Sequence, residues 1–256
     1  MGNIETGKTA EIGFLKYVAR KLVVASVSPV ARSETIDKNH SLDKAKEGLR
    51  AGKGLVIIIN HFSDKDPEQI IDKIFCQGTM DSKKIIVPIA YHKDKPIYHK
   101  MGKIIDVTLK PIVTKSTLEK EKYKNLKLNE GKVEFVNSSI ELLREGGIVV
   151  LPPQGTRVPY LDKPRTTVGT FMLETRRKGL NDYLFLFVAS GIRGITDYSK
   201  KGIDGFNLNK KYTLNIGHLM TSKEILEKAG GNFRDVDRIS YEELNAIVPY
   251  PQKQTL

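Results

Sequence analysis

A histidine and an aspartate follow the end of a strongly apolar run near residue 60. In "LVIIINHFSDKDP" (55–67) the run stops at Asn60, His61 comes next, and Asp66 precedes a proline. A histidine can accept and return a proton near neutral pH when a partner orients one ring nitrogen. Four residues separate His61 from Asp66, so the two side chains can meet across one tight turn. The pair is therefore a candidate general base with its orienting carboxylate.

The same residues are also consistent with a purely structural role. Asp66 followed by Pro67 and Gln69 is typical of a helix start, with the acid at the N-cap and the proline at the first helical position. His61 taken alone is equally consistent with a half-buried histidine that has ordinary hydrogen bonds. Capping and orienting are compatible, because a carboxylate has two oxygens to share between them.

A second apolar run ends in a loop that suits an anionic ligand. "IVVL" (148–151) leads into Pro152-Pro153-Gln154-Gly155-Thr156-Arg157. A glycine allows a ligand to approach the backbone closely, and an arginine offers two parallel donors to phosphate or carboxylate. Taken alone, this loop is just as consistent with a turn that carries a solvated arginine.

Uniformly apolar runs alternate with helical patterns along the chain. The runs that predict strands are 54–59, 84–90, 102–109, 148–151, 183–190 and 212–219. The segments that predict helices are 67–75, 132–147 and 168–179, followed by two late helices with capping-box starts, Thr221 with Glu224 and Ser240 with Glu243. Residues 110–132 are rich in lysine and predict a solvated connection or a flap. Strands without polar alternation are covered on both faces, so we expect an α/β fold with a mainly parallel or mixed central sheet flanked by helices.

Two of these loops together resemble the motifs of the glycerolipid acyltransferases. "NHFSDKD" is similar to the histidine-x4-aspartate motif of that family, and "PPQGTR" is similar to its F-P-E-G-T-R motif. The interval of about ninety residues between them also resembles the family's. "GKIIDVTLKPIVTK" (102–115) occupies the place of the second family motif, and Gly169 falls where the family has a glycine-led helix. The resemblance runs from about residue 44 to residue 192.

The resemblance implies an α/β sandwich that transfers an acyl group to a hydroxyl. His61 would deprotonate a glycerol hydroxyl, which then attacks the thioester of acyl-CoA or of acyl-carrier protein. Asp66 would orient His61 and stabilise its protonated form. No covalent acyl-enzyme is required, so the single cysteine, Cys76, has no expected catalytic role.

The resemblance also implies the residues that bind the acceptor. Arg157 would hold its phosphate, Gly155 would let that phosphate approach the backbone, and Gln154 and Thr156 belong to the same loop. Lys115 would replace the arginine of the second family motif. Two departures concern the acceptor: the family's motif glutamate is Gln154 here, and a lysine offers a point charge instead of a planar fork.

The N-terminal segment predicts an amphipathic helix in residues 1–35, ahead of a single acyltransferase domain in 36–256. Phe14, Leu15, Val18 and Leu22 supply apolar surface, and Lys16, Arg20 and Lys21 lie off that stripe. The helix either packs on the protein core or lies in a membrane interface, and both are compatible with its composition. The sequence shows no secretory signal pattern and no run of the roughly 20 apolar residues that a spanning helix needs.

Charge and composition limit the partners. The net charge of +12 favours nucleic acid, anionic lipid or acidic protein. Aromatic residues make up only 7% of the chain and tryptophan is absent, so a nucleic-acid partner is not expected. We expect an anionic membrane surface and the acyl donor as partners, no metal, no further cofactor, and a cytoplasmic protein peripheral on the inner face of the membrane.

The favoured function is acylation of 1-acylglycerol 3-phosphate to phosphatidate. The alternatives are acylation of glycerol 3-phosphate itself, or a family member without activity that only binds lipid. The substitution of glutamate by Gln154 motivates the last alternative, and the intact His61–Asp66 pair argues against it.

Overall fold

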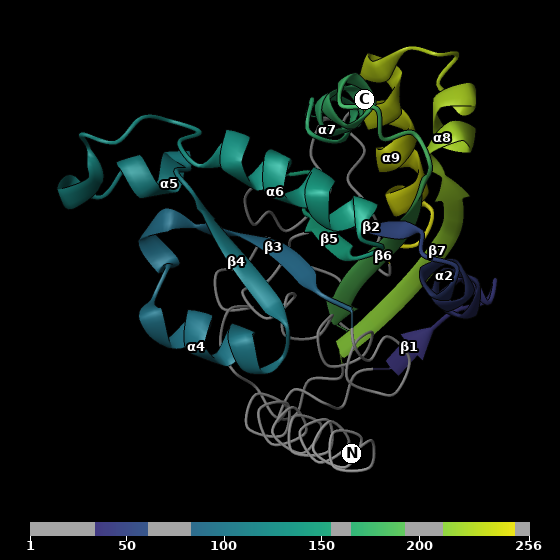
Figure 1. The fold of residues 1–256 in the computed structure, drawn as a ribbon, viewed down its shortest axis with the longest axis horizontal. Coiled ribbons are helices and arrows are strands. Elements are labelled where there is room, and N and C mark those ends of the chain that lie inside the picture. The colour runs from purple at the N-terminus through teal and green to yellow at the C-terminus, as the bar shows by residue number, and fades with distance from the viewer. Residues whose placement is uncertain (1–33, 61–82, 155–164, 193–211, 249–256) are drawn as a thin grey trace, which may run out of the picture.

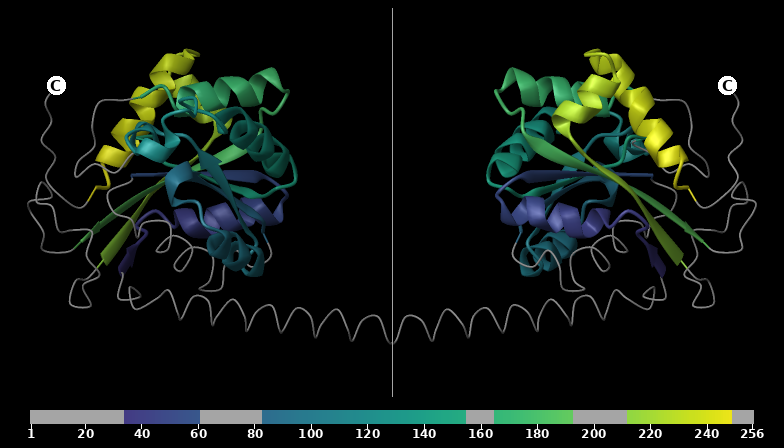
Figure 2. Two further views of the ribbon diagram at one scale, coloured as in Figure 1. Left: turned by 90° about the vertical axis from the view of Figure 1, so that its left-hand side faces the viewer. Right: turned by 90° about the vertical axis from the view of Figure 1, so that its right-hand side faces the viewer.

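The computed structural model describes residues 34–60, 83–154, 165–192 and 212–248. They form one seven-stranded sheet in the order β1-β7-β6-β2-β5-β3-β4, with helices on both of its faces (Figures 1 and 2). The predicted α/β class with a mainly parallel, mixed sheet is therefore confirmed. The predicted domain 36–256 begins inside the first strand, and residues 1–33 lie outside the described residues.

The strands fall into a parallel group of five and an inverted pair. β6, β2, β5, β3 and β4 run in one direction, and β7 pairs antiparallel with β6 and parallel with β1. In chain order the strands are β1 (Glu34–Ile36), β2 (Gly54–Ile59), β3 (Ile85–Ala90), β4 (Val107–Ile112), β5 (Ile148–Leu151), β6 (Tyr183–Ile192) and β7 (Tyr212–Thr221). The carboxyl ends of the five parallel strands consequently share one edge of the sheet.

The helices form two layers that cover the apolar faces of the sheet. α2 (Ser41–Arg50) and α4 (Pro96–Ile104) lie on one side, as the side views show (Figure 2). On the other side lie α6 (Lys132–Arg144), α7 (Val168–Arg177), α8 (Ser222–Lys228) and α9 (Phe233–Asn245). A short helix, α5 (Lys115–Leu118), and single 3-10 turns at Tyr91–Lys93 and Glu121–Tyr123 complete the described elements.

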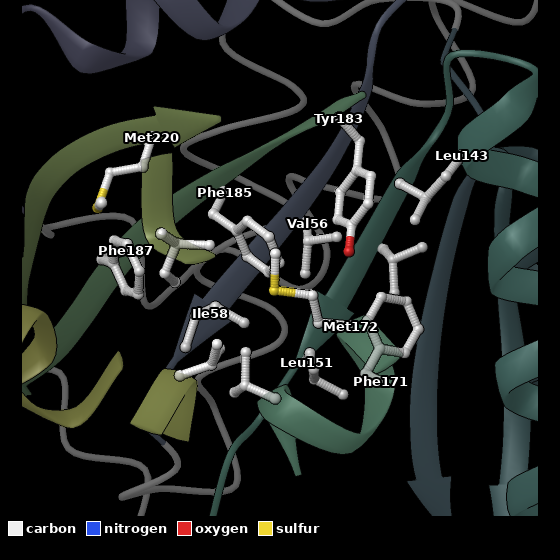
Figure 3. Packing of buried hydrophobic residues seen from close by; sticks show 14 of the residues in the cluster. Val56, Ile58, Leu143, Leu151, Phe171, Met172, Tyr183, Phe185, Phe187 and Met220 are labelled. Atoms are coloured by element: carbon white, nitrogen blue, oxygen red, sulfur yellow. The ribbon is translucent and has the colours of Figure 1, made fainter. Parts of the chain in front are cut away.

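The central strands are apolar throughout because both of their faces are buried. Along β2, Leu55, Ile57 and Ile59 pack on the side of α2, whereas Val56 and Ile58 pack on the side of α6 and α7. Figure 3 shows the second of these clusters, in which Phe171 and Met172 of α7 lie against the strands. Each such side chain contributes roughly 1.5–3 kcal/mol when it leaves water completely, so the sheet centre carries much of the stability.

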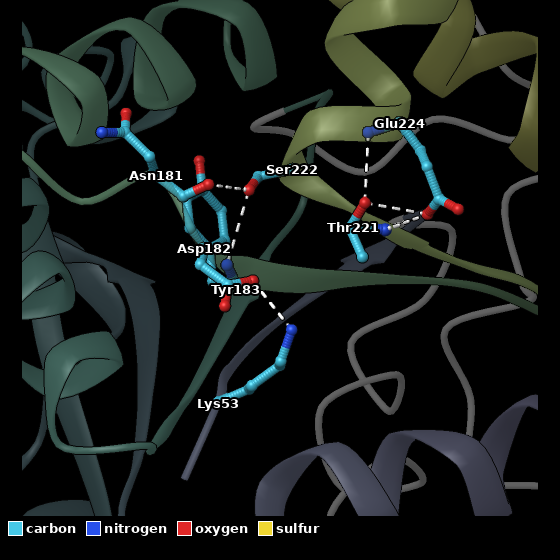
Figure 4. Close-up of polar contacts among 7 residues, drawn as sticks. All are labelled: Lys53, Asn181, Asp182, Tyr183, Thr221, Ser222 and Glu224. Atoms are coloured by element: carbon cyan, nitrogen blue, oxygen red, sulfur yellow. Dashed lines mark hydrogen bonds and ion pairs between the residues drawn. The ribbon is translucent and has the colours of Figure 1, made fainter. Parts of the chain in front are cut away.

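Polar contacts hold the amino end of β6 and the start of α8. The Tyr183 hydroxyl lies 2.8 Å from Thr175 Oγ1, and burial raises the pKa of Tyr183. Ser222 Oγ donates to the Asn181 carbonyl at 2.6 Å, at the junction shown in Figure 4. The predicted capping box at Thr221 is confirmed, because its side chain and that of Glu224 each accept from the other's backbone N–H (Figure 4).

Two local predictions differ from the structure. The run 102–109 was expected to be one strand, but α4 continues to Ile104 and β4 begins only at Val107, after Asp106 in the left-handed region (φ 56°). The capping box predicted at Ser240 is wrong, because α9 continues through Ser240 to Asn245. Ser240 Oγ instead donates to the Val236 carbonyl one turn earlier, at 2.7 Å.

The lysine-rich segment 110–132 is more ordered than a plain connection. It contains the end of β4, the helix α5 and a 3-10 turn before α6 begins at Lys132. Gly131, at the N-cap of α6, has a positive φ of 84°, and a side chain there would collide with the Pro111 carbonyl. The segment is therefore fixed to β4 at both of its ends.

Candidate functional site

The two motif-bearing loops leave from neighbouring strands at the same edge of the sheet. β2 and β5 pair in parallel, and Ile58 is the partner of Leu151. His61 and Gln154 each follow their paired residue by three positions along the chain. Adjacent strands lie about 4.8 Å apart. The two loops are about ninety residues apart in sequence, but they begin at adjacent strand ends. These ends lie at the carboxyl edge of the sheet, where ligands bind in sheets of this kind.

Asn60 fixes the point at which the chain leaves β2. Its side chain is buried at 1% exposure, its Nδ2 donates to the Ser190 carbonyl at 3.0 Å, and Ser190 N–H donates to its Oδ1 at 2.7 Å. The amide of Asn60 copies the donor and acceptor of a peptide group, so it extends the pairing of β2 with β6 beyond Ile59. The backbone immediately before His61 is consequently held in place.

The beginning of the second loop is held by α7. The Pro153 carbonyl accepts a hydrogen bond from Thr167 Oγ1 at 3.0 Å, just before α7 begins. Gln154 is buried at 1% exposure. A neutral amide suits this position, because a glutamate carboxylate taken out of water would need a compensating charge or several hydrogen bonds. Burial therefore offers a physical reason for glutamine where the acyltransferase motif has glutamate.

An aspartate from α9 caps α7 from a distance. Asp237 Oδ1 accepts from Val168 N–H at 2.8 Å and from Gly169 N–H at 3.2 Å. Desolvation raises the pKa of Asp237, and the hydrogen bonds from the α7 backbone oppose that shift only in part. The helices can approach because residue 169 is a glycine: a Cβ there would lie 1.9 Å from the Phe233 carbonyl oxygen. The glycine singled out in the sequence therefore has a packing role.

Five of the seven predicted site residues lie outside the described residues. They are His61, Asp66, Gly155, Thr156 and Arg157. Gln154 is buried at the end of β5, as described above. Lys115 is exposed as the first residue of α5, directly after Thr114, which caps that helix.

Lys115 follows a strand that ends at the same edge of the sheet, which we call the functional edge, but this strand is not a neighbour of β2 or β5. It follows β4, which is separated from β2 by β3 and β5 in the sheet order. Where these strands are paired, three spacings of about 4.8 Å place the axes of β4 and β2 roughly 14 Å apart. Lys115 is therefore three strands away from β2, the strand that precedes His61 in the sequence.

β3 separates from β5 before it reaches this edge. The two strands pair only at Ile85 and Ile86, although β3 continues beside β4 to Ala90. Pro88 has no N–H to donate, and a proline at this position is consistent with the end of the ladder. The carboxyl ends of β5 and β3 are therefore less tightly joined than those of β2 and β5.

Two features of the site escaped the sequence analysis. The pairing of Asn60 with Ser190 joins residues 130 positions apart, and the cap from Asp237 to α7 spans 68 and 69 positions. No local pattern signals either contact. The only hint was an asparagine at the end of a fully apolar strand, where a buried amide requires partners.

The described ranges contain no group of three histidine, cysteine, aspartate or glutamate side chains placed to hold a metal ion. In the same ranges, no helix is long and apolar enough to cross a membrane. The chain was compared with family models and with curated proteins, and neither comparison found a match.

Proposed function

We propose that this protein transfers a fatty acyl group from a thioester to the hydroxyl of 1-acylglycerol 3-phosphate. The observation that supports the proposal is the parallel pairing of β2 with β5, which brings the histidine-aspartate loop and the glutamine-glycine-threonine-arginine loop to adjacent strand ends. An acyl transfer of this kind needs two groups of the enzyme close together: a base for the hydroxyl of the acceptor and a site that binds the phosphate of the same acceptor molecule. The resemblance of the two loops to the acyltransferase motifs is the reason for assigning the base to the first loop and the phosphate site to the second.

In this proposal His61 is the general base and Asp66 orients it. The base removes the proton of the acceptor hydroxyl as its oxygen attacks the thioester carbonyl, and the thiol of the donor leaves with a proton. A positioned general base contributes typically about 10²–10⁴-fold to the rate. The Asn60–Ser190 pairing supports the role of His61, because a base must be held within hydrogen-bond reach of the hydroxyl.

The acceptor phosphate is assigned to the second loop. Arg157 would bind it through its planar fork, with Gly155 and Thr156 offering backbone and hydroxyl groups. Gln154 would contribute a neutral amide, and Lys115 a more distant positive charge. The donor is acyl-CoA or acyl-carrier protein, and the net charge of +12 suits both because both are acidic. We place the protein at the cytoplasmic face of the membrane, where its acceptor and product partition.

Two alternatives use the same residues differently. Glycerol 3-phosphate presents the same phosphate and hydroxyl without the acyl chain, so the site chemistry alone favours neither acceptor. A lipid-binding protein without activity is motivated by Gln154 and would retain phosphate binding but not turnover.

The test is a transfer assay of the purified protein with a labelled acyl thioester and each of the two acceptors. We expect His61→Ala to reduce turnover by about 10³-fold or more, and Asp66→Asn by about 10²-fold or more, with normal circular dichroism. His218→Ala, at an exposed position of β7, and Asp235→Asn, at a half-buried position of α9, are matched controls and should retain activity. Full activity in His61→Ala, or no transfer to either acceptor by the unaltered protein, contradicts the proposal.

A further inference from the structure

Helix α4 exposes large apolar side chains to the outside. Among the described residues, the exposed large hydrophobic side chains are Tyr91, Ile97, Tyr98, Ile104, Leu128 and Val133, and four of these six lie on α4 or on the turn before it. Ile97 is the most exposed of the four, at 53%. Among the described residues, α4 and the turn before it thus carry the larger group of exposed apolar side chains.

The helix does not need these side chains for its own packing. Its only buried residue is Gly102, and a Cβ there would lie 2.3 Å from the Val107 carbonyl oxygen. The backbone of α4 therefore approaches β4 directly at this glycine. Ile97 and Ile104 are seven positions apart and share one face of the helix, which the structure leaves exposed.

Lysines border this apolar face. Lys100 lies one turn from both Ile97 and Ile104 along the helix surface, and Lys103 is next to Ile104; both lysines are exposed. Lys95 Nζ lies 5.9 Å from the centre of the Tyr98 ring. With Lys93, the segment 91–106 contains four lysines and two aspartates, and one of these acids, Asp94, is already bonded to His99 at 2.5 Å. The segment is therefore positively charged.

An apolar face with lysines at its border and tyrosines at its end matches the interface of an anionic bilayer. Isoleucine side chains can enter the acyl boundary, lysine stems can extend to the headgroups, and tyrosine rings favour the headgroup level. Each basic residue near such a surface increases partition roughly fivefold. A helix of nine residues is far too short to span the bilayer, so it would lie along it.

The place of α4 in the fold links this face to the candidate site. The turn that leads into α4 begins at Tyr91, directly after β3 ends at Ala90, on the edge shared with β2 and β5. Figure 1 shows α4 at the periphery of the ribbon, on the other side of β4 from α6. We propose that the exposed face of α4 docks on an anionic phospholipid bilayer and so places the functional edge beside the membrane. The choice of a lipid partner rests on the proposed function, whereas the surface itself does not.

Vesicle sedimentation of the full-length protein tests this inference. The probes are vesicles of phosphatidylcholine alone and vesicles with about 40% phosphatidylglycerol, so that each cation faces a strongly anionic surface. We expect Lys100→Glu/Lys103→Glu to reduce partition onto anionic vesicles by about 30-fold or more. Ile97→Ser/Ile104→Ser should reduce it by about tenfold. If a charge reversal disturbs folding, Lys100→Gln/Lys103→Gln removes the two charges without reversing them and should reduce partition by about 25-fold.

Two control variants carry matched substitutions away from α4. One changes lysines on the opposite helix layer, and the other changes the remaining exposed apolar residues. Lys178→Glu/Lys223→Glu changes the net charge equally at the end of α7 and on α8, and Leu128→Ser/Val133→Ser removes two apolar groups that are together more exposed than Ile97 and Ile104. Partition that is unchanged in both α4 variants, or reduced equally by the controls, overturns the inference. Sedimentation contains no acyl donor, so it measures docking independently of the transfer assay. Docking through α4 by a protein that shows no transfer activity would refute the proposed function alone. Transfer activity without docking would refute this inference alone.

Discussion

At the scale of single residues, a buried amide does the work that a peptide group does elsewhere in the sheet. Asn60 stands where β2 would otherwise end, and its two hydrogen bonds to Ser190 keep β2 and β6 together for one more position. Side-chain pairing of this kind is demanding, because few side chains present both a donor and an acceptor with this spacing. The identity of the residue before His61 is therefore under a structural constraint.

Asn60→Asp is expected to destabilise the protein in a way that depends on pH. At pH 7 the carboxylate has no proton for the Ser190 carbonyl, and the expected loss in the free energy of unfolding is about 2–3 kcal/mol. Desolvation should raise the pKa of the new aspartate, so a protonated group that can donate again appears as the pH falls. Denaturant unfolding at pH 7 and at about pH 4 should show a smaller loss at the lower pH.

The control for this change is Asn181→Asp, an exposed asparagine in the turn before β6, which should cost less than about 0.5 kcal/mol. A loss of equal size at both pH values would mean that packing, not the missing donor, accounts for the effect.

At the scale of elements, α7 connects the second loop to the rest of the fold. Thr167 bonds the Pro153 carbonyl ahead of the helix, and Asp237 of α9 binds the first backbone N–H groups within it. Asp237 Oδ2 is buried and has no hydrogen-bond partner among the described residues. The cap thus holds a carboxyl group in a poorly solvated position, which explains the direction of its pKa shift.

This cap should make stability depend on pH. The pKa of Asp237 is raised by folding, so the folded state binds its proton more tightly than the unfolded state. The resulting stabilisation is fully present below the ordinary aspartate pKa of about 3.9, and is lost as the pH rises through the raised value. Asp237→Asn retains an acceptor for α7 but cannot ionise. Its free energy of unfolding should therefore fall less than that of the unaltered protein between about pH 4 and pH 7.

Asp235→Asn, at a half-buried position of the same helix, is the control for loss of a carboxylate and should change the pH dependence less than Asp237→Asn does. Asp237→Ala removes the acceptor itself and should cost about 1–2 kcal/mol at all of these pH values. An identical pH dependence for Asp237→Asn and the unaltered protein would show that the carboxyl group keeps its ordinary pKa.

At the scale of the whole molecule, charge and exposed apolar surface should act together at a membrane. The chain carries a net charge of +12, and α4 adds an apolar face to it. Electrostatic attraction is screened by salt, with a Debye length of about 10 Å at 0.1 M and about 3 Å at 1 M, whereas apolar insertion is not screened. Binding of the full-length protein to anionic vesicles should therefore fall by at least about tenfold between these salt concentrations without disappearing.

Sedimentation across that salt range measures the two contributions separately. Neutral vesicles serve as the control and should bind weakly, with little dependence on salt. If the protein does not bind anionic vesicles at low salt, a soluble acceptor such as glycerol 3-phosphate becomes the better proposal. The predicted interfacial role of residues 1–35 would then also be wrong.

Local sequence patterns determined most of the central sheet. The strands 54–59 and 148–151 were predicted with the bounds that the structure has, because residues buried on both faces must be apolar at every position. The capping box of Thr221 and Glu224 was also predictable, since its partners are three residues apart. Where two local patterns competed, as at 102–109 and at Ser240, α4 and α9 continued through the residues at which a strand or a new helix was expected to begin.

The tertiary structure alone decided which segments became neighbours. The pairing of β2 with β5, the bonds between Asn60 and Ser190, and the cap from Asp237 to α7 join residues far apart along the chain. Such contacts depend on strand order and on how closely helices approach, as at Gly169 and Gly102, and a single sequence encodes neither locally. The sequence thus determined the chemistry available to the candidate site, and folding determined that its two loops begin side by side.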